Sequence, residues 1–220
     1  MMALLNEKDA NAVRDRLARL THPVKLVFFT QETECLSCRE TRDLLHELTN
    51  LSEQLDLDVY DFVHDADAVE KYAIDKIPAI AVVGDTDTNI RFFGVPAGYE
   101  FISLLQAIEM VGNHQNGLSD DTLARLAGIT SPVHLQVFVT PTCPYCPSAV
   151  VTAHRLALAN SHIRADMVEA AEFPHLVQRY HVQGVPRVVI NDNRHFEGAL
   201  PEQLFVEQVV DAVRTTASHT

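Results

Sequence analysis

The sequence lacks several features that would place it in a specialised class of protein. Its 220 residues contain no tryptophan, only 4 cysteines, and no apolar run of the about 18 residues that a membrane-spanning helix needs. Basic residues are scarce as well, because 17 Lys and Arg face 30 Asp and Glu. The net charge of -13 repels nucleic-acid phosphates and anionic lipid headgroups. Residues 1–9 show no basic segment followed by an apolar stretch, so we expect a cytoplasmic protein that binds neither nucleic acid nor membrane.

What remains is the composition of a globular chain. With 47% hydrophobic and 21% charged residues, the sequence is neither disordered nor collagen-like. Its length allows one large domain or two small ones. Four cysteines in a reducing compartment are not expected to staple the fold, so metal binding or redox chemistry is the better interpretation.

The cysteines lie in two motifs of identical spacing, Cys35-Leu36-Ser37-Cys38 and Cys143-Pro144-Tyr145-Cys146. The first cysteines are 108 positions apart (143 − 35 = 108), which is nearly half the chain. Tyr72 and Tyr180 repeat at the same offset, and so do Pro78 and Pro186. In each half the distance from the first cysteine to this proline is 43 residues (78 − 35 and 186 − 143). The chain is therefore predicted to be an internal duplication.

Both halves show the same order of expected elements: a helix, a βαβ unit, a helix, a β-hairpin and a last helix. Helices are expected at 6–20, 99–111, 119–127 and 201–214, after each cysteine motif and across each repeated tyrosine, and strands at 24–29, 57–63, 133–139 and 165–169 and on both sides of each hairpin turn. Asn6 and Ser119 are the expected N-caps of the first helix in each half. The repeat offset falls to 104 near Gly94 and Gly198, so the turn at 84–89 is predicted to be four residues longer than its counterpart near 191–193.

This alternation of strands and helices predicts an α/β fold in which each unit has a mixed central sheet with helices on both faces. We place the N-terminal unit at 1–112 and the C-terminal unit at 118–220. Residues 113–117 are polar and end in glycine, which is typical of a linker.

Two cysteines separated by two residues at the start of a helix form a redox-active pair. Unpaired backbone N–H groups at a helix start favour a thiolate, so Cys35 and Cys143 are the expected attacking thiols. Cys38 and Cys146 are then positioned to resolve the mixed disulfide. Pro147 removes a donor inside this helix, and we expect the helix start to be distorted there.

These motifs resemble those of the thioredoxin superfamily, in which a CxxC at the start of a long helix is followed about 40 residues later by a proline before a strand. The Pro144-Tyr145 centre is similar to that of glutaredoxin. The tandem arrangement resembles the two-domain protein disulfide oxidoreductases of thermophilic archaea and bacteria, and the similarity covers nearly the whole chain. It is carried by residues 23–26, 92–98, 137–147 and 166–170.

The resemblance implies two tandem thioredoxin-like folds that exchange dithiols for disulfides on proteins, by reduction, oxidation or isomerisation. It also implies that Pro78 and Pro186 follow cis peptide bonds, and that the backbone of Ile77 and Val185 pairs with an extended substrate chain. No nucleotide-binding fingerprint is present, so no cofactor beyond the disulfides is expected. A separate thioredoxin-reductase-like donor is expected to supply the electrons.

The chain departs from thioredoxin in two respects. Glu34 and Thr142 stand where thioredoxin has a tryptophan, and we expect the acidic Glu34 to weaken the Cys35 thiolate and a capping Thr142 to favour Cys143. The strand before each motif carries no carboxylate, whereas Asp61 and Glu169 occupy equivalent places on the second strand. Either carboxylate, if buried, would have a raised pKa and serve as a proton acceptor. The alternative for both is a solvated strand end or a helix cap.

Two other functions stay open at this stage. The chain could be an adaptor that passes electrons from a reductase to a peroxiredoxin-like partner, as in the flavoprotein whose paired thioredoxin folds have lost one CxxC. A structural zinc site built from four thiolates is the second alternative, although its usual spacing between pairs is about 15–20 residues. The predicted role includes no resident metal.

Overall fold

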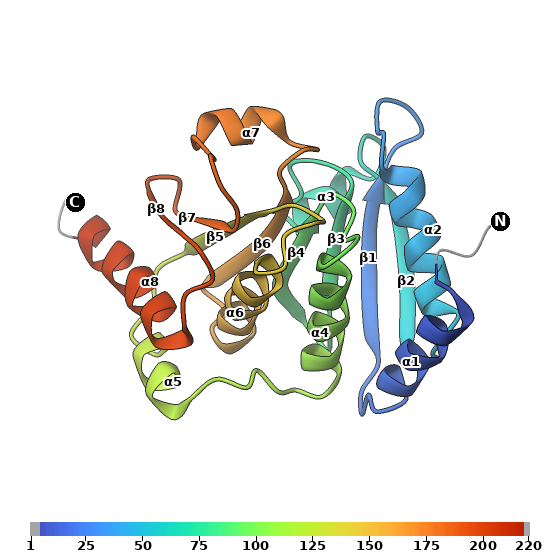
Figure 1. The fold of residues 1–220 in the computed structure, drawn as a ribbon, viewed down its shortest axis with the longest axis horizontal. Coiled ribbons are helices and arrows are strands. Elements are labelled where there is room, and N and C mark those ends of the chain that lie inside the picture. The colour runs from blue at the N-terminus through green and yellow to red at the C-terminus, as the bar shows by residue number, and fades with distance from the viewer. Residues whose placement is uncertain (1–4, 218–220) are drawn as a thin grey trace.

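Each half of the chain folds into the same succession of elements, in a computed structural model that describes residues 5–217 (Figure 1). The first half contains α1 (Glu7–Leu17), β1 (Val24–Thr30), α2 (Cys38–Thr49), β2 (Leu55–Asp61), α3 (Ala66–Lys71), β3 (Ala79–Val83), β4 (Asp87–Phe93) and α4 (Glu100–Gly112). The second half contains α5 (Asp120–Leu126), β5 (Val133–Val139), α6 (Cys146–Ala159), β6 (Ile163–Glu169), α7 (Pro174–Arg179), β7 (Arg187–Ile190), β8 (Arg194–Glu197) and α8 (Glu202–Ala217). The predicted duplication is visible in this order.

Local signals define the start of the first helix in each half, as predicted. The side chain of Asn6 accepts a hydrogen bond from the backbone N–H of Asp9 at 2.9 Å, and Ser119 accepts one from Thr122 at 3.3 Å. Each residue is therefore the N-cap of the first helix in its half.

The four extra residues of the first hairpin lengthen its strands instead of its turn. β3 and β4 have 5 and 7 residues, whereas β7 and β8 have 4 each. Both turns span three residues, so the prediction of a longer turn is wrong. The extension includes a register shift between Val82 and Val83, where an added residue can be absorbed without breaking the ladder.

All eight strands of the described chain form one sheet, in the order β2-β1-β3-β4-β6-β5-β7-β8. The halves meet where β4 pairs with β6 in parallel, from Ile90 opposite Ala165 to Phe93 opposite Val168. Because β1 also runs parallel to β4 and β6, the carboxyl ends of β1, β4, β5 and β6 lie at one edge of the sheet.

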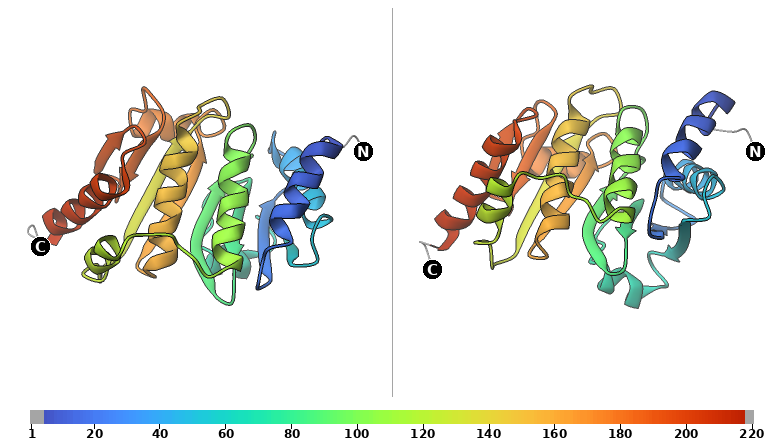
Figure 2. Two further views of the ribbon diagram at one scale, coloured as in Figure 1. Left: turned by 60° about the horizontal axis from the view of Figure 1, so that its bottom comes forward. Right: turned by 90° about the horizontal axis from the view of Figure 1, so that it is seen from below.

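Helices cover both faces of this sheet, as predicted (Figures 1 and 2). One apolar core lies under α1, α2, α4, α5, α6 and α8, and it includes Phe28, Phe92 and Phe205. On the opposite face α3 and α7 cover a smaller core around Phe29 and Phe138. α4 and α6 lie side by side across the junction, with both N-termini at the edge where the strands end.

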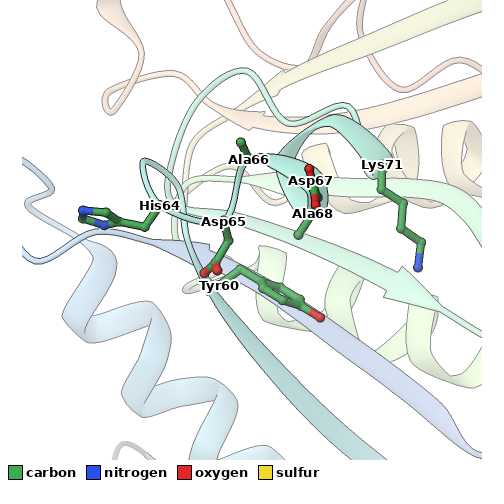
Figure 3. A pocket seen from close by; sticks show the side chains of 7 residues that line it. All are labelled: Tyr60, His64, Asp65, Ala66, Asp67, Ala68 and Lys71. Carbon is green, nitrogen blue, oxygen red and sulfur yellow. The ribbon is translucent and has the colours of Figure 1, made fainter.

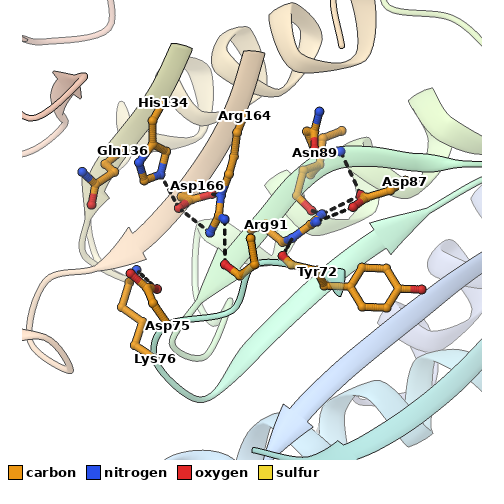
Figure 4. A network of polar contacts seen from close by, with 12 residues as sticks. Tyr72, Asp75, Lys76, Asp87, Asn89, Arg91, His134, Gln136, Arg164 and Asp166 are labelled. Atoms are coloured by element: carbon orange, nitrogen blue, oxygen red, sulfur yellow. Dashed lines mark hydrogen bonds and ion pairs between the residues drawn. The ribbon is translucent and has the colours of Figure 1, made fainter. Parts of the chain in front are cut away.

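A buried polar network also joins the halves (Figure 4). The carboxylate of Asp166 on β6 is fully buried and contacts the His134 ring at 2.6 Å and the Arg164 guanidinium at 2.8 Å. Burial alone would raise the pKa of Asp166, but these two partners outweigh burial and hold the pKa well below its usual range. Arg164 also donates to the carbonyl oxygen of Ala73, in the first half, at 2.7 Å.

No helix in residues 5–217 is long and apolar enough to cross a lipid bilayer. The segment between α4 and α5 contains the predicted linker at 113–117. The proposed domain limits, 1–112 and 118–220, stay predictions.

Candidate functional site

Both cysteine pairs are disulfides at the carboxyl edge of the sheet. Cys35 is bonded to Cys38 after β1 and Cys143 to Cys146 after β5, with Cα atoms 5.5 Å apart in each pair. The second cysteine is the first residue of the helix in both halves, α2 or α6. Each disulfide therefore lies against the unpaired N–H groups of a helix start.

The helices begin later than the sequence suggested. Tyr145 is the N-cap of α6, so Cys143 lies in the preceding turn and Thr142 is not the capping residue. Pro147 is the second residue of this helix, where its missing N–H would have had no intrahelical partner, and the predicted distortion is wrong.

The C-terminal pair has a backbone donor on the sulfur of its first cysteine. The backbone N–H of Cys146 points at the Sγ of Cys143 over 3.1 Å, and that sulfur is 3.8 Å from the carbonyl oxygen of Val185. Cys143 is 8% exposed and Cys146 is fully buried, whereas Cys35 is half-buried. Within residues 5–217 no backbone N–H points at the Sγ of Cys35 in the way that the Cys146 N–H points at the Sγ of Cys143. The two sites thus differ in their surroundings, and the prediction that Cys143 is the stronger nucleophile stays a prediction.

The repeated prolines directly precede β3 and β7, and in the second half the residue before the proline, Val185, lies next to Cys143. Both the Ile77–Pro78 and the Val185–Pro186 bonds are cis, as the resemblance implied. The prolines are buried, while Ile77 and Val185 are partly exposed. Their contact with a substrate chain stays a prediction.

The centre of each motif presents an apolar side chain to solvent. Leu36 is fully exposed and Tyr145 is 71% exposed, in a chain whose other large apolar side chains are mostly buried. These side chains stand next to the disulfides and form apolar contact points around them.

The two predicted proton acceptors have different surroundings. Asp61 is half-exposed and accepts hydrogen bonds from the backbone N–H groups of His64 and Val63, which lower its pKa, so Asp61 is not a buried carboxylate with a raised pKa and the capping alternative is confirmed. It caps the turn that follows β2. Glu169 is buried, and its Oε2 accepts from the N–H of Glu172 at 2.7 Å. Its Oε1 is buried without a hydrogen-bond partner.

A buried carboxylate that the sequence analysis missed lies at the start of α4. Glu100 is 1% exposed, and burial raises its pKa to about 7 against the opposing hydrogen bond from Ser103. The preceding N–H, of Tyr99, donates to the carbonyl oxygen of Pro141 at 3.0 Å, two residues before Cys143. The sequence did contain a signal, because Glu100 stands in helical register with the apolar residues that face the core from α4.

The geometry does not gather the four sulfurs into one metal site. The strands β1 and β5 are separated by β3, β4 and β6, so four steps of about 4.8 Å place them about 19 Å apart in the sheet, and each disulfide follows a different one of these two strands. Within residues 5–217 no cluster of three or more His, Cys, Asp or Glu side chains is placed to hold a metal ion. A tetrahedral zinc site needs all four ligands within about 2.3 Å of the metal.

One pocket of the described residues lies apart from both disulfides. Its volume is about 430 Å³, and it lies beside the start of α3 (Figure 3). Its walls are Tyr60, His64, Asp65, Ala66, Asp67, Ala68 and Lys71. None of these residues is a nucleophile paired with a base, so the candidate chemistry belongs to the disulfides and not to this pocket.

Comparisons with known proteins agree with this site. A family model described as a thioredoxin domain matches residues 133–211. The crystal structure of a protein disulfide oxidoreductase from Aeropyrum pernix K1 superposes with a TM-score of 0.90 at 30% identity, over 96% of this chain and 94% of that one. A structure of the alkylhydroperoxide reductase AhpF from Enterococcus faecalis gives a TM-score of 0.87 at 25% identity, over 93% of this chain and 99% of that one.

Among curated proteins, the F subunit of alkyl hydroperoxide reductase from Xanthomonas campestris pv. phaseoli is 27% identical over 202 residues. The match covers 92% of this chain but 35% of that protein. The chain thus spans about a third of the length of this curated relative.

Proposed function

Because the chain belongs to the two-domain disulfide oxidoreductases of the thioredoxin superfamily, we propose that it exchanges dithiols for disulfides on protein substrates. The observation that carries the proposal is the hydrogen bond from the Cys146 N–H to the Sγ of Cys143, beside the Val185 carbonyl. A sulfur held by a helix-start N–H is a stabilised thiolate once the pair is reduced.

The exchange has two steps. The Cys143 thiolate attacks one sulfur of a substrate disulfide, and the other substrate sulfur leaves as a thiolate. Cys146 then loses its proton and attacks Cys143, which re-forms the internal disulfide and releases the second substrate thiolate. The protein gives up two electrons, and the substrate disulfide becomes two thiols. Cys35 and Cys38 perform the same steps at the other end of the sheet.

A protein substrate fits the surface around the disulfides better than a small thiol does. Leu36 and Tyr145 offer apolar contact, and the partly exposed Ile77 and Val185 offer backbone groups to an extended chain. The pocket of about 430 Å³ beside α3 does not include the residues around the disulfides.

The proton of Cys146 needs an acceptor, and Glu100 and Glu169 are the candidates. Glu100 has a pKa of about 7, so it can both take and return a proton near neutral pH. It lies on α4, which packs against the helix that Cys146 begins. Glu169 offers an unpaired buried oxygen at the end of β6. Replacing each by glutamine and following release of a trapped Cys143 mixed disulfide against pH tests the assignment, since an unchanged profile removes that residue.

We further propose that a separate thioredoxin-reductase-like protein supplies electrons and that the chain needs no cofactor beyond its disulfides. A cytoplasmic site of action is part of this proposal. A second candidate, an adaptor that reduces a peroxiredoxin-like partner, is favoured by the similarity to the alkylhydroperoxide reductase AhpF.

Insulin reduction by dithiothreitol tests the main function. The protein should accelerate it, and a Cys35→Ser, Cys143→Ser double variant should be inactive. Full activity of this double variant would refute the proposal. If the protein does not reduce insulin but does reduce the disulfide of a peroxiredoxin, the adaptor function replaces the proposal of a general protein disulfide oxidoreductase.

A further inference from the structure

One side chain of the second half, that of Glu172, contacts the cysteine motif of the first half. Glu172 lies in the turn between β6 and α7, yet its Oε2 accepts a hydrogen bond from the hydroxyl of Ser37, the residue before Cys38. Its Oε1 accepts from the backbone N–H of Val95, just after β4, at 2.7 Å. The carboxylate is therefore held at the N-terminal disulfide from two sides.

The duplication explains how Glu172 reaches this place. Glu169 fixes the turn by accepting the N–H of Glu172, just as Asp61 fixes the equivalent turn by accepting the N–H of His64 at 2.9 Å. In the first half this turn follows the outermost strand, β2, and the His64 side chain is 82% exposed. In the second half it follows β6, which pairs with β4, so the same turn projects its side chain across the junction.

Gly94 provides the space for this contact. Its φ is +89°, and a Cβ there would lie 2.6 Å from the Cβ of Glu169 and 2.7 Å from the Oε1 of Glu172. Any larger residue at this position would collide with both carboxylate side chains. The end of β4 is thus built to admit acidic groups from the other half.

The surroundings of Glu172 are acidic. Burial is the largest cause of the raised pKa of Glu172, and the nearby charges of Glu169 and Glu40 raise this pKa as well. The hydrogen bonds from Ser37 and Val95 act in the opposite direction. A carboxylate held here repels a second negative charge on the adjacent dithiol. The C-terminal dithiol instead has the Cys146 N–H on its sulfur.

We propose that Glu172 is a positioning residue that the C-terminal half supplies to the N-terminal redox site, where it fixes Ser37 at the start of α2 and disfavours the Cys35 thiolate. The inference rests on the dithiol chemistry proposed above. It explains in structural terms why two copies of one motif are unequal, and it assigns part of that difference to a contact between the halves.

The test uses the full chain with Cys143→Ser and Cys146→Ser, which leaves only the N-terminal pair. After reduction, the Cys35 thiolate is titrated by its ultraviolet absorbance, and the reduction potential is measured against glutathione. Glu172→Gln keeps an oxygen for Ser37 but loses the charge, so the titration midpoint should fall by about one pH unit, a roughly tenfold larger thiolate-to-thiol ratio below the midpoint. The potential should become less negative.

Glu40→Gln is the matched control, because it removes an exposed carboxylate from the first turn of the same helix. It should shift the midpoint much less. Glu172→Ala keeps the backbone N–H that donates to Glu169, so the turn should be preserved. It should shift the midpoint in the same direction as Glu172→Gln, and agreement between the two variants shows that the shift does not come from misfolding of one of them. An unchanged midpoint in both Glu172 variants, or an equal shift in the Glu40 control, overturns the proposal. These titrations need no substrate, so they are independent of insulin turnover.

Discussion

Replacing Glu100 by glutamine should stabilise the protein at alkaline pH and leave it nearly unchanged at acidic pH. The side chain is 1% exposed, and only one of its oxygens has a hydrogen-bond partner, Ser103. Glutamine has nearly the same shape and keeps an oxygen for Ser103, but it carries no charge. The substitution therefore isolates the cost of ionising a buried carboxyl group.

The magnitude follows from the pKa. Burial raises the pKa of Glu100 from 4.5 to about 7, and each unit corresponds to about 1.4 kcal/mol, so ionisation costs roughly 3 kcal/mol in the folded state. Below pH 4.5 both states are protonated and the cost is absent. As the pH rises from 4.5, the unfolded chain ionises first and the folded state loses stability, until the loss is complete above about pH 7.

Denaturant unfolding of the oxidised protein, at pH values below 4.5 and above 7, measures this effect. The Glu100→Gln variant should gain roughly 3 kcal/mol on the parent at the higher pH and little at the lower pH. Glu207→Gln, on the exposed face of α8, is the control and should follow the parent at both pH values. A difference between Glu100→Gln and the parent that does not vary with pH would show that Glu100 is not the titrating group.

Three further changes test the site and the junction. Cys143→Ser should lose more insulin-reduction rate than Cys35→Ser, because in the described part of the chain a backbone N–H points at the sulfur of Cys143 and none at that of Cys35. Gly98→Ala should destabilise the protein by about 1–3 kcal/mol in thermal unfolding, because φ is +58° and the new Cβ would lie 2.3 Å from a backbone carbonyl oxygen. Asp166→Asn should cost about 3 kcal/mol in denaturant unfolding, because it removes the charge of a fully buried carboxylate from its ion pair with the partly buried Arg164.

Each of these has its own control. Equal losses in the two cysteine variants would refute the asymmetry of the sites. Gly184→Ala, where a Cβ would meet nothing within 4 Å, should be nearly neutral, and equal losses at both glycines would remove the steric argument. Asp58→Asn breaks an exposed ion pair with Lys25 and should cost less than about 1 kcal/mol. A similar loss at Asp58 and Asp166 would show that the junction network has no special weight.

The repeat made most of the fold predictable. The offset between Cys35 and Cys143 identified two copies of one unit, and apolar periodicity then located the elements within each copy. The N-caps Asn6 and Ser119 could be predicted because a capping side chain and the backbone N–H that donates to it lie within three residues of each other in the sequence. The cysteines and the two prolines were readable because their spacing is the same in both halves.

Contacts between the halves were not readable. The bond from Ser37 to Glu172 spans 135 residues and exists only because β4 pairs with β6, which no local pattern specifies. The different surroundings of Asp61 and Glu169 have a similar origin. The two carboxylates occupy equivalent places in the repeat, but β2 lies at the edge of the sheet and β6 lies inside it. The start of α6 was misplaced because the spacing of the CxxC motif does not specify at which of its residues the helical backbone begins.

The pairing of β4 with β6 also protects the protein from self-association. A half on its own would present β4 or β6 as a bare strand with unpaired N–H and C=O groups and with apolar residues such as Phe92 and Met167. Joined, each covers the other, and the only free edges of the described sheet are β2, which carries three aspartates, and β8, which has four residues. Charge and shortness are the means by which natural sheets resist the addition of further strands from other molecules. Duplication has therefore done more than provide a second disulfide, because it has placed the two edges most prone to aggregation against each other.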